Sequence, residues 1–336
     1  MEELTENAKG AQSEQVTDRI NGLILGAACA NSLGGSGIGL NYKEIAATTG
    51  LTGLRDFAPG LSRSAQPDHQ PGELLADALM GLCLAEALID CKGRLTEQSL
   101  QESYKCLLED ENFLGTSPGA TCLAGLRKLA DGQKPSEEGL EALHANVAAR
   151  VFASGCLPGP PKTDAAVDVA VRQAKLSHGD KRSQAAAAVV ADSLRYFVGG
   201  GRLDTEQDVR DYVKREYGVA QSIDERFAES WDDVAPDLDY HNPADDLPYS
   251  LINVESSVTE LVPTAVGIFL IFRHDPEEAI CAAARSGGDT DTVATIVGAL
   301  AGSYHGASKL PSRWLSKIAH KDRLDNVARQ LSALWN

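Results

Sequence analysis

Two carboxylates and two hydroxyls stand together in the segment Ser-Gly-Gly-Asp-Thr-Asp-Thr at 286–292. The acids are Asp289 and Asp291, and the apolar run 293–302 that follows them is typical of a buried helix. Oxygen ligands gathered this closely suit Mg2+ or Ca2+ rather than Zn2+. The two glycines before the acids permit sharp backbone turns that aim several oxygens at one point.

The same residues have a plainer interpretation. An Asp at the start of a helix is favoured by the unpaired amides and by the helix macrodipole, so either acid could be an N-cap. One cap explains one Asp, and the second acid is then left without a role at an apolar boundary. The residues alone leave both interpretations open.

Composition excludes several classes of protein. The 336 residues carry a net charge of -17, and nucleic-acid binding depends on clustered Lys and Arg, so no nucleic-acid partner is expected. Seven cysteines occur singly and without a C-x-x-C pair, which favours buried thiols and a reducing, cytoplasmic location. No apolar run reaches transmembrane length, so no membrane partner is expected either. The polar, acidic opening at 1–15 is predicted to be disordered.

Helical spacing dominates the rest of the chain, and apolar residues nowhere alternate with polar ones over a convincing length. We therefore predict an all-α fold in which residues 16–336 form one compact orthogonal bundle of about a dozen helices. Segments 154–163 and 232–248, rich in Gly, Pro or acids, are predicted loops, and the second is either a lid or a solvated excursion. The predicted helices are 18–29, 72–88, 95–108, 120–130, 135–152, 165–176, 184–198, 205–216, 258–272, 276–284, 291–304, 311–318 and 324–334.

The C-terminal motif, Gly-Gly-Asp-Thr-Asp-Thr at 287–292 followed by Val-Ala-Thr-Ile-Val-Gly-Ala-Leu-Ala-Gly-Ser-Tyr-His-Gly at 293–306, resembles the ADP-ribosylglycohydrolase family. Weaker similarity extends over most of the chain. The segment 18–26 is similar to the family's first helix, 116–121 to its Gly/Thr loop, 144–151 to an Asn-Gly-x-x-Met-Arg segment and 177–180 to its Thr-His segment.

This resemblance implies an all-helical fold with a two-magnesium cleft. It also implies hydrolysis of the bond, N-glycosyl or O-glycosyl, that joins ADP-ribose to a protein side chain or a related acceptor. By position, Asp289, Asp291 and Thr292 would be metal ligands, and the two acids would also be the catalytic residues. The resemblance further implies substrate-binding positions, which are Asn31, Gly119, Thr121, His178, Gly287 and Gly288.

The first half of the family's site departs from the pattern. Its Gly-Asp-Ala-Leu-Gly reads Ala-Asn-Ser-Leu-Gly at 30–34, and residues 35–38 replace the region of the family's Glu. Its Thr-Asp-Asp-Thr reads Leu-Ala-Asp-Ala at 75–78, which leaves Asp77 as the remaining metal ligand. Close carboxylates repel by about 4 kcal/mol per pair at an effective dielectric near 20, so three acids suit one Mg2+ better than two.

Two further positions have alternative interpretations. His178 is either a cleft contact or a turn residue before a helix capped by Asp180 or Ser183, and turn chemistry favours the second. Glu73 lies four residues before Asp77 and either replaces a missing ligand or is a first-turn acid, again with the second favoured.

Two functions of different classes fit the sequence. The first is an Mg2+-dependent hydrolase acting on ADP-ribose-modified protein, as a monomer. The second is a weakened or inactive member that binds ADP-ribose or serves structurally, as the J1 crystallins that resemble this family do. The complete Gly-Gly-Asp-Thr-Asp-Thr motif favours the hydrolase, and the altered first motif favours the second function.

Overall fold

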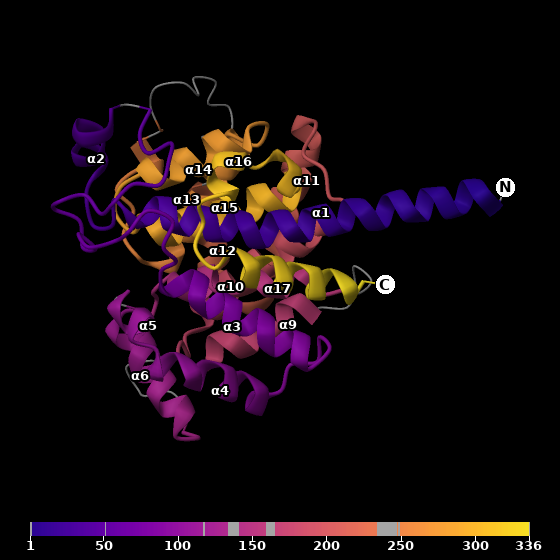
Figure 1. Ribbon diagram of the computed structural model, residues 1–336, viewed down its shortest axis with the longest axis horizontal. Coiled ribbons are helices and arrows are strands. Elements are labelled where there is room, and N and C mark those ends of the chain that lie inside the picture. Colours follow the sequence, from indigo (N-terminus) through magenta and orange to yellow (C-terminus); the bar gives the residue numbers. More distant parts are fainter. Residues whose placement is uncertain are drawn as a thin grey trace.

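Two helices, α1 (Glu2–Gly35) and α15 (Thr290–His305), lie against each other in opposite directions at the centre of the molecule (Figure 1). Their backbones approach closely because glycines face each other along this contact. A methyl group added at Gly298 would lie 2.3 Å from the carbonyl oxygen of Gly26, and one at Gly302 would lie 1.9 Å from that of Gly22. Small residues thus allow the helix that follows the acidic motif to lie directly on the first helix.

Further helices surround this pair, and Figure 1 shows α3, α4, α6, α10 and α17 on one side of α1 with α13, α14 and α16 on the other. The structure, a computed structural model, describes residues 2–50, 52–116, 118–133, 141–158, 165–233, 247 and 249–335. The other α-helices of these ranges are α2 (Tyr42–Thr49), α3 (Ala76–Asp90), α4 (Glu97–Lys105), α5 (Glu111–Gly115), α6 (Ala120–Ala130), α8 (Asn146–Ala149), α9 (Ala165–Lys175), α10 (Lys181–Val198), α11 (Glu206–Ile223), α12 (Glu225–Glu229), α13 (Val258–Ile271), α14 (Pro276–Arg285), α16 (Ser312–Leu315) and α17 (Lys321–Ala333). Short 3-10 helices are η1 (Cys106–Glu109), η2 (Phe152–Cys156), η3 (Ser230–Asp233), η5 (Tyr249–Leu251) and η6 (Ala307–Lys309).

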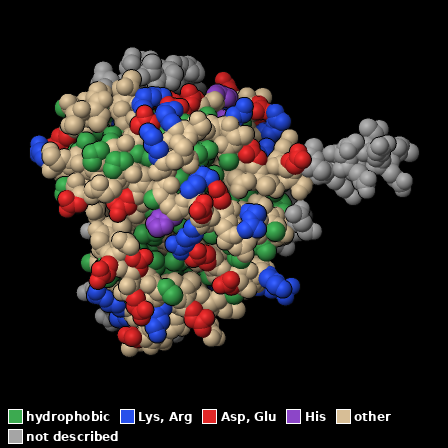
Figure 2. All heavy atoms as spheres, in the orientation of Figure 1, with side chains coloured by type: hydrophobic (Ala, Val, Ile, Leu, Met, Phe, Trp, Pro, Cys, Tyr) green, Lys and Arg blue, Asp and Glu red, His purple; other side chains and the backbone are tan. Residues whose placement is uncertain are grey.

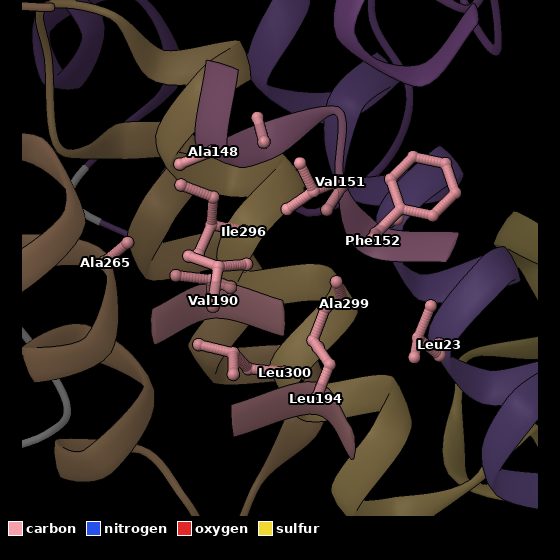
Figure 3. Packing of buried hydrophobic residues seen from close by; sticks show 14 of the residues in the cluster. Leu23, Ala148, Val151, Phe152, Val190, Leu194, Ala265, Ile296, Ala299 and Leu300 are labelled. Carbon is pink, nitrogen blue, oxygen red and sulfur yellow. The ribbon is translucent and has the colours of Figure 1, made fainter. Parts of the chain in front are cut away.

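The predicted all-α fold is confirmed. Over the described residues the chain forms no strand, only two isolated bridges, His144 with Ser257 and Val254 with Gly288. The central packing is apolar, as Figure 3 shows for Val190 of α10 and Ile296 of α15. Such a core supplies the burial that holds an all-helical domain together.

The predicted helix at 135–152 is wrong over its described part. Only α8 is α-helical there, and the residues before it pair with a distant loop. The N–H of Ala145 donates to the oxygen of Ser256 at 2.7 Å, and that of Val258 donates to the oxygen of Leu143 at 2.7 Å. Because this pairing satisfies the backbone from outside, local helix propensity does not decide the segment. Residues 134–140 lie outside the described part.

Other boundaries also differ from the prediction. Helix α3 begins at Ala76 rather than at residue 72, so Glu73 precedes the helix and is not its first-turn acid. Helix α1 includes 2–15, the opening predicted to be disordered, as a continuation of its buried half from Val16 onward. Extension of an existing helix costs far less than starting one. The assignment of 16–336 as one domain stays a prediction, and most of the predicted loop 232–248 and the end of 154–163 lie outside the described residues.

The prediction of mostly buried thiols without disulfides is confirmed, since all seven cysteines are free. Five are buried, Cys91 is half-buried and Cys106 is exposed. Figure 2 shows acidic and basic side chains interspersed on one face of the molecule, as is common on protein surfaces. Within the described ranges, no helix combines the length and the apolar character needed to cross a membrane.

Candidate metal site and ligand cleft

The acidic motif leads into α15, and Asp289 occupies the N-cap position of that helix. Its side chain nevertheless makes no capping hydrogen bond. The interpretation of this acid as an ordinary cap is therefore not realised in the structure. Asp289 and Asp291 thus lie at the start of a helix whose following residues are buried, and Asp289 is not used as a cap.

The two glycines before the acids hold the turn in place. Gly287 and Gly288 have φ angles of 84° and 82°, in the left-handed region that glycine adopts readily. The backbone of Gly288 exchanges hydrogen bonds of 2.8 Å with Leu40 and Gly39, and a methyl group at this position would lie 2.1 Å from the oxygen of Val254. These glycines therefore pack against neighbouring loops and do not line the cleft.

Asp77 reaches the same place from α3. Its side chain is only 3% exposed, and its Oδ2 accepts a hydrogen bond of 2.9 Å from the hydroxyl of Thr292. One residue from each half of the site is thus in direct contact. The structure brings together the four residues that the sequence assigns to a metal, which are Asp77, Asp289, Asp291 and Thr292.

The electrostatics show that these acids are crowded. Burial, and then the charge of Asp289, raise the pKa of Asp77 to about 7 against the opposing effects of Thr292 and Arg150. Burial, followed by Asp289 and Asp77, raises the pKa of Asp291 well above its ordinary value. The pKa of Asp289 is raised mainly by burial, although a hydrogen bond with Asp291 opposes the shift. Without a cation, this cluster holds protons at pH values where ordinary carboxyl groups have lost them.

This donor set fits a hard divalent cation. Its ligands are all oxygens, and the Thr292 hydroxyl donates its hydrogen to Asp77 and keeps its lone pairs free. In the described part of the chain, no three His, Cys, Asp or Glu side chains already form a ready-made metal site. A bound cation would relieve the repulsion among these acids.

A cavity of about 410 Å³ opens beside these acids. Of the predicted substrate-binding residues it includes Gly119 and Thr121, but not Asn31, His178, Gly287 or Gly288. Its lining residues are Ile38, Ala65, Gln66, Ala76, Asp77, Thr116, Pro118, Gly119, Ala120, Thr121, Cys122, His144, Asn146, Ser256, Asp289, Asp291 and Thr292.

Asn31 has a structural role that the sequence did not predict. It is fully buried, its amide nitrogen donates to the Thr295 hydroxyl at 3.0 Å, and its Oδ1 accepts from the N–H of Leu75 at 2.7 Å. Leu75 is the N-cap residue of α3, so Asn31 fixes the start of the helix that carries Asp77. The prediction of Asn31 as a substrate contact is not supported, because both ends of the side chain are already bound inside the core.

His178 also lies in the core rather than in the cleft. Its Nδ1 is 2.8 Å from the Ser177 hydroxyl, and burial, aided by the charge of Arg150, lowers the pKa of the ring to about 3. Asp180 caps α10 by accepting from the N–H of Arg182, which confirms the predicted cap. His178 is fully buried in the turn before α10 and is not among the lining residues.

The loop before α6 presents backbone donors to the cavity. Gly119 is the N-cap residue of α6. The N–H groups of the first helical turn have no partner within the helix, and no side chain of the N-cap residue bonds them. Residues 118–122 line the cavity. No Lys or Arg of the described ranges lines it, so an anionic ligand would be bound chiefly by these amides.

Five polar residues of the lining were not among the predicted site residues: Gln66, Thr116, His144, Asn146 and Ser256. Nδ1 of His144 lies 3.1 Å from the Ser256 hydroxyl, and Oδ1 of Asn146 is buried without a hydrogen-bond partner. His144 and Asn146 lie in the segment 144–151 that resembles the Asn-Gly-x-x-Met-Arg segment, so that resemblance was a signal for this region. Ser256 and Gln66 come from loops that no motif marks.

The fold and the site together define an all-α protein with an acid-lined, ligand-sized cleft. The family model for ADP-ribosylglycohydrolase matches residues 12–336, and the chain belongs to this family of ADP-ribosyl hydrolases. It is 23% identical to YegU of Escherichia coli K12 over 317 residues, covering 92% of this chain and 94% of that protein. It is 24% identical to the ADP-ribosyl-[dinitrogen reductase] glycohydrolase of Rhodospirillum rubrum over 324 residues, covering 95% and 96%.

A solved structure confirms the fold. The chain matches one titled an ADP-ribosylglycohydrolase-related protein complex with a TM-score of 0.69 and 21% identity. The match covers 96% of this chain and 100% of the other.

Proposed function

We propose that this protein hydrolyses the glycosidic bond between ADP-ribose and a protein side chain, with Mg2+ bound by Asp77, Asp289, Asp291 and Thr292. The observation that carries this proposal is the contact between Thr292 and Asp77, since it joins the two halves of the acidic site. N-glycosyl and O-glycosyl acceptors, arginine and serine respectively, both stay within the proposal. The predicted monomeric state and cytoplasmic location remain predictions.

In this proposal the lining residues have separate roles, in substrate binding and in proton transfer. The free N–H groups at the start of α6 bind the diphosphate, since a helix N-terminus attracts anions. Asp289 and Asp291 have raised pKa values, so one of them can take the proton that the attacking water loses. The water oxygen bonds to the anomeric carbon as the bond from that carbon to the acceptor breaks. The other carboxyl group, which holds a proton at its raised pKa, gives that proton to the departing acceptor. When bound, the cation supplies charge stabilisation and orders the ribose hydroxyls.

One observation favours the second function, a non-catalytic ADP-ribose-binding protein. Ile38, from the region where the family has its Glu, lines the cavity, and Asn31 is buried in place of an Asp. Both changes remove oxygen ligands from the half of the site that faces Asp289. A cleft altered in this way could retain binding after losing turnover.

The deciding experiment incubates the protein and Mg2+ with ADP-ribosylated arginine and serine peptides and follows free ADP-ribose. We expect release by the parent and a loss on the order of a hundredfold for Asp289→Asn, since a preorganised charged group contributes about that much. Asp211→Asn, a change of an exposed acid on α11, is the matched control and should leave the rate unchanged.

Calorimetry separates the two functions. If the parent binds ADP-ribose but releases none from either peptide with saturating Mg2+, the non-catalytic function replaces the hydrolase. If Asp289→Asn and Asp291→Asn bind Mg2+ as the parent does, the assignment of the metal ligands is wrong.

A further inference from the structure

A buried histidine lies in the loop between α2 and α3, next to the part of this loop that lines the cleft. His69 is 2% exposed, although its neighbours Asp68 and Gln70 are exposed. Its Nε2 lies 2.8 Å from the backbone oxygen of Ser32, in the last turn of α1. Since a carbonyl oxygen only accepts, Nε2 carries the hydrogen and donates it. The imidazole therefore ties this loop to the first helix from inside the molecule.

The same histidine closes a turn that begins in the cleft. The N–H of His69 donates to the oxygen of Gln66 at 3.2 Å, and Pro67 occupies the second position of this turn, where proline is favoured. Gln66 itself lines the cleft. One end of the turn is thus open to a ligand, and the other end is anchored in the core.

Near this turn the loop is also bound to the chain that follows α1, but through a less protected contact. The N–H of Ala65 donates to the oxygen of Ile38 at 2.8 Å, and Ala65 is exposed. Backbone bonds at the surface open more readily than bonds in the core. The buried bond of His69 is therefore expected to fix the place of Gln66 in the cleft.

The Gln66 carboxamide is not used by the described part of the protein. None of the described residues forms a hydrogen bond with this side chain, which is half-buried at the cleft. A carboxamide offers both a donor and an acceptor, and it is uncharged. It can bind a polar group of a ligand without adding charge to a cleft already lined by acids.

We propose that Gln66 is a ligand-binding residue that hydrogen-bonds bound ADP-ribose, and that His69 is the positioning residue that holds Gln66 in the cleft. The identity of the ligand rests on the proposed function, whereas the anchoring of the loop by His69 does not. His69 acts only through the turn, because it does not line the cleft.

Hydrogen exchange of the Ala65 amide tests the anchor without ligand or metal. His69→Leu removes the donor to Ser32, so this amide should exchange about tenfold faster, as expected when a buried hydrogen bond is lost. His69→Gln keeps an N–H close to the position of Nε2 and should exchange as the parent does. Unchanged exchange in His69→Leu would overturn the anchoring role.

His305→Leu is the matched control for the loss of a histidine. His305 also bonds a backbone oxygen through Nε2, that of Arg273 at 2.9 Å, and it does not line the cleft. The control should leave both the exchange of the Ala65 amide and the affinity for ADP-ribose unchanged. A change equal to that of His69→Leu would show a general loss of stability and contradict the proposal.

A pH profile separates the anchor from simple packing. Burial lowers the pKa of His69, although the bond to Ser32 and the charge of Glu73 oppose the shift. Glu73 is the charged group that faces the ring, with Oε2 at 3.7 Å from Nδ1, while α1 and the residue before α3 present the uncharged Ser32, Gly35 and Leu75. The anchored loop therefore disfavours protonation, and its stability falls as the pH drops below about 6.5, the ordinary pKa of histidine.

Between about pH 7.5 and pH 5.5 the protection factor of the Ala65 amide should fall severalfold in the parent and stay constant in His69→Gln, which does not titrate there. Other titrating groups are common to the two proteins, so the difference between their profiles isolates His69. If His69→Leu does not fold, this comparison decides the anchoring role, and parallel profiles would contradict it.

Calorimetry with ADP-ribose at saturating Mg2+ tests the ligand role of Gln66. Gln66→Ala should bind about fivefold more weakly, as expected for one neutral hydrogen bond. His69→Leu should weaken binding by a similar factor, and His69→Gln should bind as the parent does at neutral pH. Gln70→Ala, an exposed change in the same loop outside the cleft lining, is the matched control and should leave the affinity unchanged. Full affinity in Gln66→Ala would overturn the ligand role.

Failure of the proposed function gives a different pattern of results. If the parent binds no ADP-ribose, the ligand role of Gln66 falls together with the proposed function, and the exchange data still decide for or against the His69 anchor. If the parent binds ADP-ribose and Gln66→Ala binds it more weakly, but no peptide is hydrolysed, the hydrolase function alone is wrong and the roles of Gln66 and His69 are supported.

Discussion

Thr292 directly joins the two acidic segments of the site. Its hydroxyl donates to Asp77, and its position in the first turn of α15 places it next to Asp291. Asn31 supports the same contact. It accepts a hydrogen bond from the start of α3 and donates one to Thr295, which lies in the next turn of α15. Individual polar side chains therefore set the distance between Asp77 and the C-terminal acids.

Replacing Thr292 by Val should weaken both the fold and the site. The change leaves a buried oxygen of Asp77 without its donor, which costs about 1–2 kcal/mol of unfolding free energy. It also removes a proposed ligand, so Mg2+ affinity should fall by about tenfold. Denaturant unfolding in chelator and calorimetry with Mg2+ measure the two effects.

Thr290→Val provides the comparison at the same helix start. The Thr290 hydroxyl is buried and donates to the oxygen of Gly34 at 2.7 Å, away from the carboxylates. A similar loss of stability with unchanged Mg2+ affinity is expected. Equal losses of affinity in both variants would contradict a ligand role for Thr292.

At the scale of elements, the antiparallel contact of α1 and α15 determines where the acids lie. Gly298 and Gly302 on α15 face Gly26 and Gly22 on α1, with backbone atoms where side chains would otherwise stand. A larger side chain at these positions would push α15 away from the first helix. The acids precede α15 directly, so their position relative to Asp77 depends on the same close approach.

Gly298→Ala should therefore destabilise the protein by about 3 kcal/mol, at the upper end for overpacking, because the new methyl would meet backbone rather than a flexible side chain. Thermal or denaturant unfolding measures the loss. Gly218→Ala on α11 is the matched control, since nothing lies within 4 Å of its added methyl, and it should gain up to about 1 kcal/mol from helix propensity. A neutral Gly298→Ala would show that the helices are not held by this contact.

A second element, the loop between α2 and α3, is held by ion pairs at one end and by backbone hydrogen bonds such as that from the N–H of Ala65 to the oxygen of Ile38 at 2.8 Å. Arg55 of this loop pairs with Glu277 and Glu278 of α14, and Arg313 of α16 also bonds Glu277. This network is partly exposed, so each pair adds little stability on its own. The ion pairs matter for the site because they help to hold the loop that contributes Ala65 and Gln66 to the cleft.

At the scale of the whole molecule, the buried acids make stability depend on pH and on metal. The pKa of Asp77 is about 7 in the folded chain and near 3.9 when unfolded, so the folded state holds a proton that the unfolded state has released. The contribution of the Asp77 carboxyl group to the free energy of unfolding is fully present below about pH 4, and it is lost as the pH rises towards 7.

With a chelator present to remove metal ions, the free energy of unfolding of the parent should fall between pH 5 and pH 8 by about 2 kcal/mol more than that of Asp77→Asn. Saturating Mg2+ should offset the loss at pH 8, since a ligand of the folded state stabilises it. Denaturant unfolding at the two pH values, with Asp211→Asn as a surface control, measures both effects. Parallel pH profiles for the parent and Asp77→Asn would contradict the buried, crowded state of this acid.

The sequence by itself determined the helical class, the free thiols and the acids of the C-terminal motif. Apolar periodicity is a local property, so most of the long helices were predicted, and α6 was predicted at its observed bounds. The resemblance of 75–78 and 287–306 to known motifs supplied Asp77 and its partners. These features depend on residue type and short spacing, which a chain displays before it folds.

Only the tertiary structure decided what each polar residue faces. Asn31 and His178 have residue types suited to a cleft, yet both are buried in the core. Asn31 is held there by Leu75 and Thr295, which lie far along the chain, and His178 by the turn before α10, where it contacts Ser177. His144 and Ser256 reach the cleft because backbone pairing joins two loops more than a hundred residues apart. Burial and hydrogen bonding depend on all neighbours at once, so the contact of Asp77 with Thr292 and the burial of Asn31 could be found only in the folded chain.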